Sequence, residues 1–305
     1  LTYLPFGHIV PQGDTTGIPV RLSDAMELID RTTDFIVSNQ HLQLVDELTT
    51  SKRFKNIKLL NYVDEYDPDV QKQFAAMTYR LSLDTYLVVF RGTDDTLIGW
   101  KEDFHMTYMD HVPAQKRAAS YLQNVMKEFP KGRFLVAGHS KGGNLATYAC
   151  SYLPDSLFEW VDAIYSYDAP GLNKAIIETE GYQRTSPNIR RFVPQGSIVG
   201  MMLEVPEPTT IVKSRALGGF AQHDAFTWEI KDYSFVTVSE TSPDSQQTDL
   251  TLKQWVRETS AEERKKFFDT FFGIFLDAGI TSINDLTDLK QLAKAKEILQ
   301  NAQDL

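Results

Sequence analysis

Hydrophobic residues recur along this chain in two alternating patterns. Three segments carry apolar side chains at helical spacing, residues 22–37, 115–129 and 145–153. Four short apolar runs between them read as strands, residues 86–90, 134–137, 163–167 and 189–193. Continuous apolar strands that alternate with amphipathic helices are typical of a parallel sheet buried between helices. The pattern therefore predicts an α/β fold with a mainly parallel sheet covered by helices.

The pattern changes after residue 206. Three β-rich pieces follow, at 210–214, 226–230 and 235–238, and charged helices then continue to the end of the chain. We expect these helices to dock onto the sheet or to form a cap. Because no repeat, low-complexity tract or linker interrupts the chain, one domain is predicted for residues 1–305. Its expected parts are an N-terminal helical and strand part (1–84), a catalytic core (85–240) and docked C-terminal helices (250–305).

Composition narrows the class of protein. The 305 residues are 42% hydrophobic, enough for a sizeable core, and their net charge of −10 opposes binding to nucleic acid or to an anionic membrane through bulk charge. The single cysteine, Cys150, excludes an internal disulfide and fits a reducing compartment, so a cytoplasmic location is expected. No apolar run reaches the roughly 18 residues of a membrane span, and no transmembrane segment is expected.

The candidate chemistry is concentrated in the segment FLVAGHSKGGNLATYAC, residues 134–150. A G-x-S-x-G motif between an apolar strand and a helix of small residues places its serine on a sharp strand-to-helix turn. Gly138 and Gly142 would let the strand and the helix approach closely. Ser140 is therefore the predicted nucleophile of a serine hydrolase, and the backbone N–H of Lys141, at the helix N-terminus, is a predicted oxyanion donor.

The order of residues selects the predicted base and acid. In hydrolases with this turn the acid and then the histidine follow the serine, and His223 is the one histidine after Ser140. Asp168 is the preferred acid because it stands at the C-terminal end of the predicted strand 163–167, where catalytic residues of parallel sheets collect. The alternative for Asp168 is that it caps a turn. His139 lies inside the serine turn and is expected to contact substrate rather than to act as the base.

A second oxyanion donor is expected after the strand at 86–90. The Thr93 backbone N–H, together with its hydroxyl, can face Ser140 there, unless this is an ordinary strand-ending turn. The adjacent Asp94 and Asp95 favour loop capping over a metal site, and neither a metal nor a cofactor is predicted. Met201 and Met202 belong to an apolar run that suits either an acyl chain or core packing.

Four motifs resemble one family. They are FRGT (90–93), GHSKGGNLA (138–146), YDAPG (167–171) and HDAFTW (223–228), with a weaker match at the start of the chain, LTYLPFGHIVP. Together they are similar to a bacterial group of lipase-like hydrolases of poorly defined function, related to the class-three lipases. The resemblance implies an α/β-hydrolase fold, acyl-ester hydrolysis, the Ser140 nucleophile, the His223 base and an oxyanion loop at Thr93.

One departure from the class-three lipases concerns the acid. Those enzymes carry it after a later strand, where this chain has Ser197. Pancreatic-type lipases carry it after the strand that Asp168 follows here. The sequence therefore predicts a Ser-His-Asp esterase that acts on a small-molecule acyl ester, with a lipid as one candidate. The alternative is a catalytically silent binding protein, with an aromatic stripe in the C-terminal helix, at Phe267, Phe271, Ile274 and Phe275, packed on the sheet or used as a partner groove.

Overall fold

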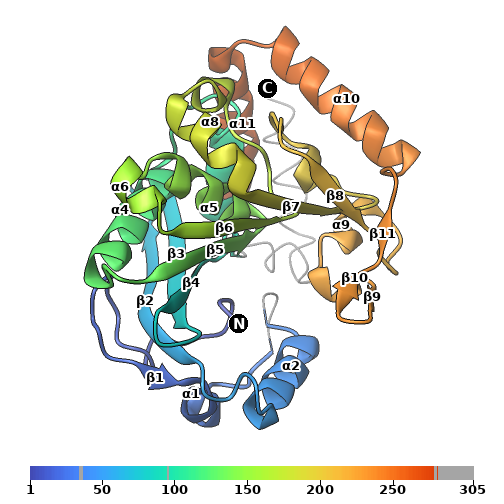
Figure 1. Ribbon diagram of the computed structural model, residues 1–305. Helices are drawn as coiled ribbons and strands as arrows, with labels where there is room; N and C mark the ends of the chain where they lie inside the picture. Colours follow the sequence, from blue (N-terminus) through green and yellow to red (C-terminus); the bar gives the residue numbers. More distant parts are fainter. Residues whose placement is uncertain (34–36, 95, 278–279, 281–305) are drawn as a thin grey trace.

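A nine-stranded sheet runs through the protein in the order β1-β2-β3-β4-β5-β6-β7-β8-β11 (Figure 1). The computed structural model describes residues 1–33, 37–94, 96–277 and 280. Neighbouring strands from β4 to β8 are parallel, whereas β1 to β4 and the β8–β11 pair are antiparallel. The α/β fold with parallel central strands is confirmed. The strands are β1 (Val20–Arg21), β2 (Lys58–Asp67), β3 (Lys72–Arg80), β4 (Thr85–Phe90), β5 (Arg133–His139), β6 (Val161–Tyr167), β7 (Ile189–Pro194), β8 (Thr209–Val212) and β11 (Thr237–Val238), with a separate hairpin of β9 (Ile230–Lys231) and β10 (Ser234–Phe235).

Helices cover both faces of this sheet (Figure 1). Side chains alternate between the faces along each strand, so Phe74 and Ala76 of β3 pack toward α4 and α5, while Met77 and Tyr79 pack toward α1 and the N-terminal segment. The helices are α1 (Leu22–Leu28), α2 (Asn39–Thr50), α3 (Leu97–His105), α4 (Pro113–Glu128), α5 (Lys141–Ser151), α6 (Asp155–Phe158), α7 (Lys174–Ile177), α8 (Glu180–Thr185), α9 (Gly219–Gln222), α10 (Pro243–Glu258) and α11 (Ala261–Asp277), with short 3₁₀ turns η1 (Ser186–Asn188), η2 (Val199–Met201) and η3 (Ala225–Thr227).

The antiparallel strands β2 and β3 were not predicted from the sequence. In β2 the pairing register shifts between Leu60 and Val63, and Asn61 has a positive φ of 53°. Such a bulge breaks the alternation of apolar and polar residues that identifies a strand. The strand expected at 226–230 is wrong in its first half, because Ala225–Thr227 forms the 3₁₀ turn η3, whereas Trp228 bridges to Ser214 and Ile230 begins β9.

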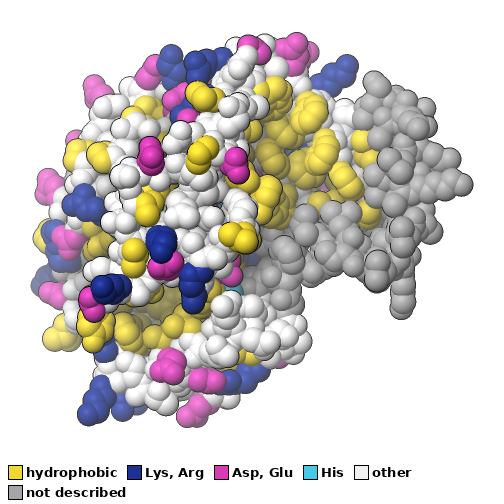
Figure 2. Space-filling model, turned by 90° about the vertical axis from the view of Figure 1, so that its right-hand side faces the viewer, with side chains coloured by type: hydrophobic (Ala, Val, Ile, Leu, Met, Phe, Trp, Pro, Cys, Tyr) yellow, Lys and Arg dark blue, Asp and Glu magenta, His cyan; other side chains and the backbone are white. Residues whose placement is uncertain are grey.

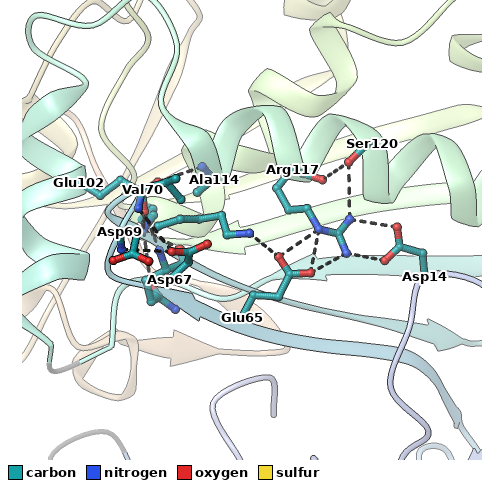
Figure 3. A network of polar contacts seen from close by, with 12 residues as sticks. Asp14, Glu65, Asp67, Asp69, Val70, Glu102, Ala114, Arg117 and Ser120 are labelled. Carbon is teal, nitrogen blue, oxygen red and sulfur yellow. Dashed lines mark hydrogen bonds and ion pairs between the residues drawn. The ribbon is translucent and has the colours of Figure 1, made fainter.

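An ion-pair network ties the N-terminal segment to the sheet. Arg117 of α4 donates hydrogen bonds to the carboxylates of Asp14, at 2.6 and 2.9 Å, and of Glu65 in β2 (Figure 3). Lys72 of β3 also pairs with Glu65, at 2.8 Å. Because these charges are only partly exposed, the cluster is screened less than a surface pair and joins α4, β2, β3 and the N-terminal segment.

The C-terminal helix α11 packs against α3 rather than directly on the sheet. Its buried aromatic residues are Phe268 and Phe272, which form a cluster with Leu97 of α3. The predicted stripe is therefore wrong in part, since Phe267 and Phe271 are 55% and 44% exposed. The helical positions that face α3 lie one residue further along the chain, a choice that only the docking partner determines.

Candidate active site

Ser140 stands at the turn between β5 and α5. Its backbone has φ 57° and ψ −135°, a conformation that non-glycine residues rarely adopt. The flanking glycines permit this turn: a Cβ on Gly138 would lie 2.1 Å from the carbonyl of Gly142, and one on Gly142 would lie 2.2 Å from the Phe90 oxygen. The strand, turn and helix therefore hold the Ser140 side chain at the carboxyl end of the parallel strands.

His223 and Asp168 are brought together from loops at the same edge. His223 Nδ1 lies 2.6 Å from Asp168 Oδ2, and the Asp168 side chain is fully buried. Asp168 follows β6 directly and also has a positive φ, of 42°. Its neighbour Arg191 of β7 donates hydrogen bonds to the carbonyls of Ala169, at 2.8 Å, and Gly200, at 2.5 Å. The guanidinium thus holds the loop after Asp168 against the loop after β7.

Ser197, at the position where the class-three lipases carry their acid, contacts Asp168. Its hydroxyl donates to Asp168 Oδ1 at 2.5 Å and accepts the Gly200 N–H at 3.0 Å. One carboxylate oxygen of Asp168 therefore faces His223 and the other faces Ser197. The carboxylate and the hydroxyl come from adjacent parallel strands, β6 and β7, and meet where both strands end. The sequence reasoning treated Ser197 only as a missing acid and did not find this contact.

His139 packs directly against His223 and forms a hydrogen bond with its backbone. The two rings are 4.5 Å apart between centroids, and His139 Nε2 donates to the backbone oxygen of His223 at 2.8 Å. Burial, and to a smaller extent the nearby His223, lowers the pKa of His139 to about 4, so His139 is neutral at pH 7. Because Nε2 carries the hydrogen, Nδ1 accepts from the Tyr3 hydroxyl, 3.3 Å away. Between Ser140 and His223, both described, the structure contains no direct hydrogen bond.

Tyr3 is a site neighbour that the sequence reasoning missed. A Cβ on Gly92 would lie 2.3 Å from the Tyr3 hydroxyl and 3.2 Å from the Ser140 Cβ, so Gly92 allows both side chains to approach the loop. Burial raises the pKa of Tyr3 to about 12, which keeps its hydroxyl protonated. The weak family match at the start of the chain was the available signal for this residue.

Thr93 lies in the loop after β4, next to Gly92, but its hydroxyl is hydrogen-bonded to helix α3. Thr93 Oγ1 donates to Asp103 Oδ2 of α3. Burial raises the pKa of Asp103 to about 6, and the neighbouring Lys141 ammonium opposes this rise. The Thr93 hydroxyl thus fixes the loop to α3, which leaves its backbone N–H as the group that can face a ligand.

The Lys141 side chain is buried beneath the serine turn. Its ammonium lies 2.6 Å from Glu102 Oε2 and 2.9 Å from the Gln73 oxygen, and both charged side chains are 0% exposed. Glu102 also accepts the backbone N–H groups of Gln73, at 3.0 Å, and of Ala114, at 2.9 Å (Figure 3). The lysine therefore joins α5 to β3, α3 and α4. Only its backbone N–H is free to act as the predicted oxyanion donor.

Of the two predicted acyl-contacting methionines, Met202 lines an apolar cavity with Leu203 and Phe104. Met201 ends the short turn η2 and does not line that cavity. The same loop approaches Asp168, because a Cβ on Gly200 would lie 2.6 Å from Asp168 Oδ1. The structure thus separates two neighbouring residues that the sequence treated alike.

A family model described as Mbeg1-like matches residues 48–273, which include Ser140, Asp168 and His223. The chain belongs to the Mbeg1-like family. No curated protein matches it. The matched residues include the four motifs on which the predicted resemblance rests, residues 90–93, 138–146, 167–171 and 223–228.

Solved structures of lipases resemble this Mbeg1-like chain distantly. A structure described as a fungal lipase is 10% identical, with a TM-score of 0.45, over 83% of this chain and 88% of its own. A structure of a mutant of MDLA from Penicillium cyclopium is 14% identical, with a TM-score of 0.41, over 63% of this chain and 76% of its own. A lipase of Rhizopus microsporus var. chinensis is 19% identical (TM-score 0.38, 53% of this chain covered), and the match spans 63% of its length. Such distant likeness leaves the chemistry to be judged from the residues of the site.

The part of the chain that the structure describes includes no helix long and apolar enough to cross a membrane. Among those same residues no group of three or more histidine, cysteine or acidic side chains is arranged to hold a metal ion.

Proposed function

We propose that the protein is a serine hydrolase that cleaves acyl esters. The observation that carries the proposal is the buried Asp168 carboxylate 2.6 Å from His223 Nδ1, beside the strained Ser140 turn. When Nδ1 donates its hydrogen to Asp168, the other ring nitrogen of a neutral His223 is unprotonated and can accept a proton. Asp168, rather than Ser197, is then the acid, with Ser197 holding its second oxygen.

The reaction would proceed in two acyl-transfer steps. Ser140 Oγ attacks the ester carbonyl while His223 Nε2 takes its proton, and the imidazolium then protonates the departing alcohol or thiol. Water, deprotonated by His223, attacks the acyl-enzyme and releases the acid. The backbone N–H groups of Lys141 and Thr93 would hold the oxyanion in both steps. Losing one such donor typically costs about 10² to 10³ in kcat.

The substrate side of the site is also part of the proposal. His139 and Met202, which belongs to the same apolar segment as Met201 but lines the cavity, would contact a small-molecule ester or a lipid. If Met202 meets the acyl chain, Met202→Ser should raise KM for p-nitrophenyl octanoate more than for the acetate. Met201→Ser is the matched control, since Met201 lies outside the cavity wall. Equal effects of both variants on both esters would remove the methionines from the substrate site.

A fluorophosphonate probe tests the nucleophile most directly. Intact-mass analysis should find one adduct per chain, absent in Ser140→Ala, and p-nitrophenyl butyrate hydrolysis should be lost in Ser140→Ala and His223→Ala. Well-folded protein that forms no adduct would instead be the catalytically silent binding protein.

A series of variants tests the acid. Asp168→Asn should lower kcat by up to roughly 10⁴, because the carboxylate holds the histidine tautomer and stabilises the imidazolium. Ser197→Ala should cost much less, because it removes one hydrogen bond to a carboxylate that keeps its contact with His223. Glu204→Gln is the control and should leave kcat unchanged. An active Asp168→Asn enzyme with a normal fold would refute the assignment.

A further inference from the structure

Helices α10 and α11, together with α3 and the loop that follows η2, line an apolar cavity that opens to the surface. Its volume is about 260 Å³, and its walls include Phe104, Met202, Trp255, Phe267 and Phe268. Hydrophobic side chains also gather in the upper part of the face drawn in Figure 2, the side of the molecule that carries α10. An apolar cavity of about 150 Å³ already stays dry and binds benzene. A hydrocarbon chain would therefore fit this space.

A second cavity of about 220 Å³ lies directly beside the first. The two share four lining residues, Thr107, Leu203, Leu252 and Val256. The second cavity differs in charge, because four cationic side chains and one acidic residue line it: Lys174, Lys253, Arg257, Arg264 and Glu204. In a protein of net charge −10, this excess of positive charge is a local feature.

Two of these cations form no ion pair with any of the residues that the structure describes. Lys253 pairs with Asp249 at 2.8 Å. Within the described residues, Arg257 and Arg264 form no ion pair, and the polar contacts of both guanidinium groups go to backbone oxygens or a hydroxyl of α10 and its C-terminus. The Nε of Arg264 is buried and has no hydrogen-bond partner among the described residues. Guanidinium groups that form no ion pair favour a carboxylate or a phosphate as ligand, because they can bind either one through paired hydrogen bonds.

We propose that the two cavities together bind a single-chain amphiphile with an anionic head. The hydrocarbon tail lies in the cavity lined by Trp255 and Met202, and the carboxylate or phosphate head lies at Arg257 and Arg264. A neutral head leaves the guanidinium groups without an anion, and a cationic head is repelled. Phe104 follows Asp103, the partner of Thr93, so the occupied cavity packs against the helix that supports the candidate oxyanion loop.

Binding can be measured without turnover on the Ser140→Ala protein, so its outcome does not depend on ester hydrolysis. Isothermal titration calorimetry with dodecanoate, dodecyl phosphate, dodecanol and dodecyltrimethylammonium, each below its micellar concentration, compares the head groups. We expect one bound molecule of either anion per chain and affinity for dodecanol at least tenfold weaker. Tighter binding of dodecanoate would identify a fatty acid as the ligand, and tighter binding of dodecyl phosphate a phosphorylated lipid.

Substitutions locate the head group. Arg257→Gln should weaken binding of both anions by about 10- to 100-fold, the usual range for one charge-assisted hydrogen bond, and leave dodecanol binding unchanged. Arg190→Gln, an exposed arginine of β7 outside both cavities, is the control. Leu252→Glu, at the shared wall, should abolish binding of both anions. Equal affinity for all four ligands, no binding at all, or anion affinity unaffected by Arg257→Gln would overturn the proposal.

Discussion

Replacing Lys141 by methionine should destabilise the protein strongly, although methionine fits the buried volume. The lysine ammonium and the Glu102 carboxylate are 2.6 Å apart and both side chains are 0% exposed. Removing the ammonium leaves a carboxylate buried among α3, α4 and β3 without its counter-charge. Breaking a buried pair in this way costs about 3–5 kcal/mol, a large part of a typical folding free energy of about 5–15 kcal/mol.

The surroundings of Glu102 set the expected value within that range. Glu102 keeps two backbone donors, the N–H groups of Gln73 and Ala114, after the lysine is gone. These hydrogen bonds partly stabilise the orphaned charge, so we expect the lower limit, about 3 kcal/mol. In the double variant Lys141→Met/Glu102→Gln the charge itself is removed. Its cost should therefore fall below the sum of the two single costs by about 1–3 kcal/mol.

Urea denaturation followed by circular dichroism gives the free energy of unfolding of each variant. Lys265→Met is the matched control, because Lys265 is 62% exposed and pairs with Asp269 at 2.5 Å on the surface of α11. Its loss should cost less than about 1 kcal/mol. The reasoning is refuted if Lys141→Met costs no more than this control, or if the costs of Lys141→Met and Glu102→Gln simply add.

Three further predictions concern other buried groups. Burial raises the Asp103 pKa from 3.8 to about 6, so ionisation costs stability as pH rises between these values. Relative to Asp103→Asn, the natural protein should lose about 2 kcal/mol from pH 4 to 7 in urea titrations. Gly138→Ala should lower the melting temperature and hydrolysis sharply because its Cβ would overlap Gly142, whereas Gly273→Ala in α11, with open space around it, should stabilise by up to about 1 kcal/mol. Buried Cys150, whose pKa burial raises, should react with a thiol reagent only in urea; a fast reaction of native protein would contradict its burial.

The serine turn could be predicted because its cause is local. Gly138 leaves space for the Gly142 backbone within one strand, turn and helix, and the motif is visible in five consecutive residues, although Gly142 itself faces Phe90 of the neighbouring strand β4. His223 and Asp168 followed from chain order and from strand ends, and the structure places their side chains 2.6 Å apart. Their catalytic roles stay a proposal, because proximity alone does not establish turnover.

Contacts between distant segments could not be predicted from the sequence. Tyr3 reaches His139 across 136 positions of sequence, and no periodic pattern indicates such a contact. Ser197 was interpreted as the loss of an acid, whereas its hydroxyl donates a hydrogen bond to Asp168, which follows the adjacent strand β6. The strand β2 was missed because a bulge at Asn61 interrupts its alternation.

The α/β fold, the serine turn and the candidate residues Ser140, Asp168 and His223 could all be predicted from the amino-acid sequence. These features depend on side-chain periodicity and on backbone freedom over a few residues. The tertiary structure decided what each polar side chain faces: Lys141 pairs with Glu102 below the turn, and Arg257 and Arg264 meet at a cavity between helices. The reason is physical, since the partner of a buried charge is set by how sheet and helices pack, and packing joins residues whose separation along the chain carries no signal.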